Sequence, residues 1–103
     1  MKMIKWASDI IAGNIREAKR YADEAFRLKD SSPMASEWCR EMANMHLHFN
    51  TQGHAYVKRL IDNYEASDHH SELAPGMKAA YEEIHADLIR QTAEIKAMLD
   101  LYK

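Results

Sequence analysis

The stretch KDSSPMAS, residues 29–36, divides this chain into helices. Pro33 has no backbone N–H and a fixed φ angle, so it is favoured at the first position of a helix and disfavoured inside one. Ser32, immediately before it, is a residue type that commonly caps a helix N-terminus. The stretch therefore predicts that one helix ends near Leu28 and that the next begins at Pro33.

A second break of the same kind follows at ASDHHSELAPGM, residues 66–77, where Pro75 is placed to open another helix. Outside the two breaks, apolar residues recur at spacings of three and four, which is the period of a helix, and strand-like alternation is missing. We expect three helical segments, at about residues 4–28, 33–65 and 75–102.

Gly53 lies inside the second segment, and a helical glycine costs about 1 kcal/mol relative to alanine. The segment NTQG, residues 50–53, could therefore divide this helix into two shorter ones. The apolar pattern continues in phase through Gly53, which favours a single long helix.

The apolar stripes predict which side chains form the core. In the first segment the stripe consists of Ile4, Ala7, Ile11, Ala18, Ala22, Ala25 and Leu28. In the second it consists of Trp38, Met42, Met45, Phe49, Tyr56, Leu60 and Tyr64. In the third it consists of Met77, Tyr81, Ile84, Leu88, Ile95, Met98 and Tyr102.

The chain of 103 residues has the length of one domain, which we take as residues 1–103. Helices of 25 to 33 residues would be about 40 to 50 Å long, and short connections make neighbouring helices antiparallel. We therefore expect an all-α, long-helix antiparallel three-helix hairpin. Three thin, alanine-rich helices leave apolar surface uncovered, so we expect a homodimer that completes a larger bundle.

The composition is that of a globular protein, with 47% hydrophobic and 29% charged residues and a formal net charge of −2. Charges of both signs are interleaved, which disfavours a nucleic-acid surface. No apolar run approaches the roughly 18 residues needed to cross a bilayer, and the N-terminal residues lack the features of a signal peptide. The single cysteine, Cys39, fits a reducing compartment and a small buried side chain. We expect a cytoplasmic protein that binds neither nucleic acid nor membranes.

Ligand-type side chains flank the apolar stripes, most visibly in EMANMHLHFNTQGH, residues 41–54. Helical bundles bind metals through carboxylates and imidazoles that converge from facing helices. Counting along antiparallel helices from each break predicts two polar levels, one near Glu17 and one near His54. The candidate metal ligands are Glu17, Glu41 and His48 at the first level, and His54, Glu82 and His85 at the second.

Ordinary structural roles are equally open to these residues. Glu82 and His85 could simply be solvated, Glu17 and Glu41 could pair with neighbouring arginines, and the histidines could be boundary residues bonded to nearby polar groups. Motifs for phosphate binding, for a Cys-x-x-Cys zinc site and for a nucleophile elbow are missing from the sequence. An enzyme is therefore the less favoured interpretation.

The pattern resembles the ferritin-like family, in particular its short rubrerythrin-type and phage-associated helical members. The resemblance rests on NIREAKRYADEA, on EMANMHLHFNTQGHAYVKRLI and on YEEIHADLIRQTAEIKAMLDLYK. It implies a helical bundle that holds iron or another divalent metal through glutamates and Glu-x-x-His pairs, with Glu17 as a carboxylate ligand and Glu82 with His85 as such a pair.

Two functional hypotheses follow. The first is a ferritin-like, divalent-metal- or iron-binding helical protein. The alternative is a non-enzymatic helical module, without a metal site, whose role is self-association or binding to another protein.

Overall fold

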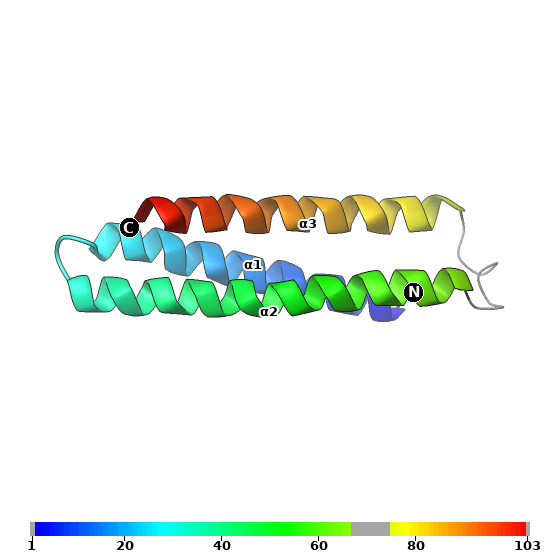
Figure 1. Cartoon of the computed structure of the whole chain (residues 1–103), viewed down its shortest axis with the longest axis horizontal. Helices are drawn as coiled ribbons and strands as arrows, with labels where there is room; N and C mark the ends of the chain where they lie inside the picture. Colours follow the sequence, from blue (N-terminus) through cyan, green and yellow to red (C-terminus); the bar gives the residue numbers. More distant parts are fainter. Residues whose placement is uncertain (1, 67–74, 103) are drawn as a thin grey trace.

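The computed structural model describes the backbone of residues 2–66 and 75–102, and the side chains of residues 3–63 and 79–101. The described residues form three long helices, α1 (Lys2–Leu28), α2 (Pro33–Ala66) and α3 (Pro75–Tyr102). They lie side by side in an elongated, up-down-up arrangement of 57 × 16 × 16 Å (Figure 1). The all-α class is confirmed, and the helix ends differ from the expected ones by at most two residues.

The connection between α1 and α2 is a short turn held by backbone hydrogen bonds, and Pro33 is the first residue of α2. The backbone N–H of Ser32 donates to the carbonyl of Leu28 at 2.8 Å, and the N–H of Ser36 donates to the carbonyl of Ser32 at 2.9 Å. The buried hydroxyl of Ser36 also donates across the hairpin to the carbonyl oxygen of Ala25. These bonds hold the first turn of α2 against the last turns of α1.

Small side chains let α1 and α2 approach closely along their whole length. Four alanines at the interface, Ala18, Ala22, Ala25 and Ala43, are fully buried. A Cβ atom added to Gly53 would lie only 2.8 Å from Cγ1 of Ile11, which explains a glycine at this position of a continuous α2. Most contacts between helices are made by this α1–α2 hairpin.

The third helix covers one side of the hairpin less extensively. Leu88, Ile95 and Leu99 of α3 complete the core, but α3 makes far fewer contacts with α1 and with α2 than those two helices make with each other. The ion pairs found among the described side chains each join residues three or four apart on one helix. Charge therefore supports the individual helices, whereas apolar packing joins them.

Six of the seven predicted core residues of α1 are buried and Leu28 is half-buried, whereas most of the predicted core stripe of α2 is wrong. Within that stripe, Met42 and Leu60 are half-buried, and Leu60 packs against the core. The apolar side chains of α2 that lie in the core are Cys39, Ala43, Leu47, Val57 and Ile61. The large residues expected there are substantially exposed, namely Trp38, Met45, Phe49 and Tyr56. Ile84 of α3, also expected inside, is exposed. For α2 the reason is steric, because its close approach to α1 favours small side chains at the contact and turns the largest ones outward.

Three predicted core residues, Tyr64, Met77 and Tyr102, lie outside the described side chains. The burial of Cys39 is confirmed. Within residues 2–66 and 75–102, none of the helices combines the length and apolar character that a membrane span requires.

Candidate functional site

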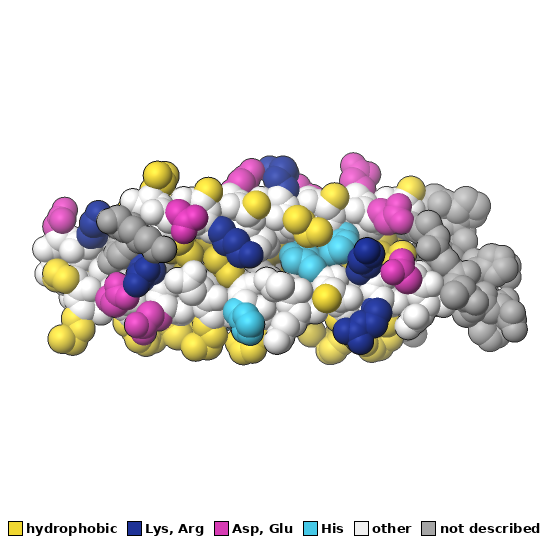
Figure 2. All heavy atoms as spheres, in the orientation of Figure 1, with side chains coloured by type: hydrophobic (Ala, Val, Ile, Leu, Met, Phe, Trp, Pro, Cys, Tyr) yellow, Lys and Arg dark blue, Asp and Glu magenta, His cyan; other side chains and the backbone are white. Residues whose placement is uncertain are grey.

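Two histidines meet in the seam between α2 and α3. The ring centres of His54 on α2 and His85 on α3 are 5.0 Å apart, with the ring planes inclined at 44°. Figure 2 shows histidine side chains together at the boundary between the surfaces of α2 and α3. The predicted level of His54 with His85 is thus confirmed, although 31 residues separate them in sequence.

Several buried polar atoms of this pair and of Asn50, one turn before His54 on α2, have no hydrogen-bond partner in the described part of the chain. They are both ring nitrogens of His54, Nε2 of His85 and both amide atoms of Asn50. Asn50 is 0% exposed, and it precedes His54 by one turn, so the two side chains leave the same face of α2. A buried polar group without a partner costs about 1–3 kcal/mol. Buried groups of this kind usually have a protein, water or ion partner, so these atoms can accept one.

The environment keeps both imidazoles neutral. Burial above all, and then the charges of His85 and Lys96, lower the pKa of His54 from 6.5 to about 4. Burial, and then the charge of Lys58, lower the pKa of His85 as well. Neutral imidazoles at pH 7 have a free nitrogen lone pair that can accept a hydrogen bond or bind a metal ion.

Among the described interactions, Glu17, Glu41 and His48 make none with this pair. Glu17 forms an ion pair with Arg20 on its own helix, at 2.7 Å between Oε2 and Nη2. Glu41 and His48 are exposed on α2, and Glu82 is exposed on α3 one turn before His85. The contacts described for Glu17 do not include Glu41 or His48.

His46 has a structural role instead. Its Nδ1 lies 3.0 Å from Oδ1 of Asn14, and its ring stacks on Tyr21 with ring centres 5.7 Å apart. It is therefore a boundary histidine bonded to a neighbouring polar group, one of the ordinary roles that the sequence allowed.

A carboxylate-rich two-metal centre does not fit these positions. Such a centre needs glutamates to converge with histidines from several helices. Among the side chains that the structure describes, no three or more of histidine, cysteine, aspartate and glutamate come together as a metal-binding group. The ferritin-like centre implied by the resemblance stays a prediction that this geometry does not support.

A second feature is an apolar groove of about 300 Å³ formed by α1 and α2 alone. Its lining contains no charged residue and comprises Met3, Trp6, Ala7, Ile10, Ile11, Asn14, Phe49, Gly53 and Tyr56. Figure 2 shows hydrophobic side chains along the edge of the molecule that faces away from α3. The residues that the sequence placed in the core of α2 therefore form part of an open face.

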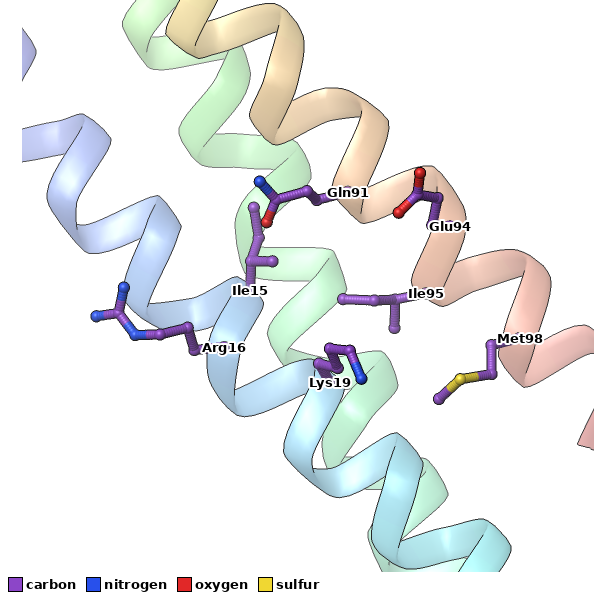
Figure 3. A pocket seen from close by; sticks show the side chains of 7 residues that line it. All are labelled: Ile15, Arg16, Lys19, Gln91, Glu94, Ile95 and Met98. Carbon is purple, nitrogen blue, oxygen red and sulfur yellow. The ribbon is translucent and has the colours of Figure 1, made fainter.

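A third hollow, of about 450 Å³, lies between α1 and α3 (Figure 3). Ile15, Ile95 and Met98 form its apolar part, and Lys19, Gln91 and Glu94 add polar groups. Glu94 also pairs with Arg90. The lining includes no histidine, cysteine or serine. It is a seam left by the loose packing of α3.

Asn50 is the site residue that sequence reasoning missed. It occupies a core position between Leu47 and Val57, and only the corrected stripe of α2 shows this. A polar residue on the small-residue stripe was the signal that could have found it.

Comparison of the chain with protein-family models, with curated proteins and with solved structures finds no match, so its function has to be inferred from the geometry of its own side chains.

Proposed function

We propose that this protein is a non-enzymatic helical module that self-associates, with two copies packing through the open face of the α1–α2 hairpin. This α1–α2 apolar face is formed by Met3, Trp6, Ile10, Trp38, Met45, Phe49 and Tyr56. The observation that carries the proposal is that these seven large side chains are each 38% to 54% exposed. Single exposed apolar residues are common, but a continuous apolar face of this kind marks an interaction surface.

The size of the face suits a dimer. Large side chains of this kind have about 200 Å² of accessible area each, so the exposed fractions leave roughly 700 Å² on one copy and roughly 1,400 Å² on two. Stable protein interfaces bury about 1,200–2,000 Å² in total. Two copies of this chain would therefore supply enough area without a further partner.

The arrangement of the helices favours a second copy as the occupant. α3 covers one side of the hairpin, and the opposite side is the apolar face. If two such faces met about a two-fold axis, the two α1–α2 hairpins would form a four-helix core with one α3 on each outer side. The groove in this face has no charged lining, so the two grooves can meet without like-charge repulsion.

Sedimentation equilibrium of the unmodified chain and of the Phe49→Glu variant tests this proposal. Phe49 lies in the groove, so a glutamate there would place a charge in the dimer interface and would make the protein monomeric while its helicity is retained. The matched control is Leu101→Glu, because Leu101 is 81% exposed on α3 and lies outside the α1–α2 apolar face. This control should remain dimeric.

Fluorescence gives an independent readout, because both tryptophans of the chain, Trp6 and Trp38, belong to this face. Their emission should shift to shorter wavelength as the protein concentration is raised through the dimerisation range. A chain that stays monomeric at hundreds of micromolar, or a Phe49→Glu variant that dimerises like the parent, would show the proposal to be wrong.

A further inference from the structure

We propose that His54 and His85, together with Asn50, bind one divalent transition-metal ion of the Zn²⁺ type in the seam between α2 and α3. This inference goes beyond self-association and does not depend on it. The α1–α2 apolar face contains none of these three residues. The proposed site also differs from a two-metal carboxylate centre, because its ligands are two imidazoles and an amide.

The distance between the two rings suits two ligands of one ion. Zn²⁺ binds histidine nitrogens at about 2.0–2.1 Å in tetrahedral geometry, which places two imidazole ring centres about 5 Å apart. The observed separation of the His54 and His85 ring centres is 5.0 Å.

The buried atoms without partners are those that a metal ion needs. Nε2 of His85 and either ring nitrogen of His54 can each donate a lone pair, and the amide oxygen of Asn50 can be a third donor. Imidazole nitrogen favours zinc, copper and nickel over calcium or magnesium, which prefer oxygen ligands. With three protein donors, the fourth position of a tetrahedral ion would be left to water.

Entry to the site is available beside His54. A pocket of about 200 Å³ opens between α2 and α3, and it is lined by Thr51, His54, Ile89, Thr92, Ala93 and Lys96. α3 is the helix with the fewest contacts to the rest of the molecule. Small adjustments of α3 can therefore admit an ion without disturbing the α1–α2 hairpin.

The charges around the site limit its affinity. Lys96 acts on His54 and Lys58 acts on His85, and both lysines lower the pKa of the histidine concerned. The same positive charges repel a cation. We therefore expect a dissociation constant for Zn²⁺ in the micromolar range.

The test is a calorimetric Zn²⁺ titration of the full chain. Because His69 and His70 are further histidines of the sequence, every protein tested would also have the substitutions His69→Gln and His70→Gln. The parent of this series should bind one Zn²⁺ per chain, and its Tm should rise by about 10 °C or more at a hundredfold excess of free Zn²⁺ over the dissociation constant.

Single variants His54→Phe and His85→Phe keep an aromatic ring but remove the ligand nitrogens. Even changes behind the ligands usually cost 10–100-fold in affinity, so each variant should weaken Zn²⁺ binding by at least about tenfold. The matched control is His48→Phe, because His48 is exposed on α2. This control should bind Zn²⁺ like the parent.

A readout on the parent protein removes any dependence on the folding of variants. In ¹⁵N NMR spectra of the imidazole rings, the signals of His54 and His85 should shift on addition of one equivalent of Zn²⁺, and that of His48 should not. The inference is wrong if the parent takes up no Zn²⁺. It is equally wrong if the His54 and His85 signals stay unchanged, or if both folded variants retain full affinity.

Discussion

Replacing Gly53 by alanine tests whether the close approach of α1 and α2 governs the stability of this protein. The substitution Gly53→Ala removes the helix cost of glycine, about 0.8–1.0 kcal/mol. The added Cβ would lie 2.8 Å from Cγ1 and 3.1 Å from Cδ1 of Ile11, and Ile11 is itself buried. Overpacking of this kind costs about 1–3 kcal/mol. We expect a net loss of about 1 kcal/mol in the free energy of unfolding, or about 5 °C in Tm.

Gly13 is the matched control. It lies inside α1 as Gly53 lies inside α2, but the nearest atom to an added Cβ there is the flexible Nη2 of Arg16, at 3.7 Å. Gly13→Ala should therefore show the propensity gain alone and stabilise the protein by about 1 kcal/mol. Urea denaturation followed by far-UV circular dichroism, at one fixed protein concentration, measures both variants.

A double-mutant cycle assigns the effect to Ile11. In an Ile11→Ala background the steric conflict is absent, so Gly53→Ala should stabilise by about the same amount as Gly13→Ala. If Gly53→Ala stabilises the otherwise unchanged chain as much as Gly13→Ala does, close packing of Ile11 against Gly53 is refuted as the constraint on this position.

Two further predictions concern the polar cluster. Asn50→Leu replaces two buried amide atoms that lack partners with a side chain of similar shape. In metal-free buffer it should therefore raise the free energy of unfolding by about 1–3 kcal/mol. Unchanged or lower stability in urea denaturation would contradict the burial of an unsatisfied amide. The lowered pKa of His54 predicts loss of stability in acid. As the pH falls from 6.5 towards 4, the unfolded chain binds a proton that the folded chain does not, so stability should fall by about 1–2 kcal/mol after allowance for solvent screening, and a His54→Phe variant should lose correspondingly less over the same range.

The helices themselves could be predicted from the sequence because their signals are local. Pro33 and Pro75 can be accommodated at the start of a helix and not within one, and each does begin a helix. The core of α1 was also predictable, because its apolar stripe is made of small and branched side chains that are buried wherever the helix packs. The proximity of His54 to His85 could be predicted by counting residues along two antiparallel helices from the break that joins them.

The buried face of α2 could not be predicted in the same way. Its large apolar residues, such as Trp38 and Phe49, predict a core stripe by size and spacing, yet the hairpin buries Ala43 and Ser36 instead. In a helix with two apolar faces, no local property of the sequence determines which face packs against the neighbouring helix. That depends on how well the surfaces of the two helices fit together.

Three long helices, their ends and their antiparallel order are properties of the amino-acid sequence, because proline chemistry and helical periodicity act within a few residues. The packing of the helices against one another is what places small side chains in the interior and leaves the aromatic residues on an open face. The same packing buries Asn50 in the core, where no partner for its amide is found among the described residues. The physical reason is that close packing depends on the shapes of both partners, and a single helix contains only one of them.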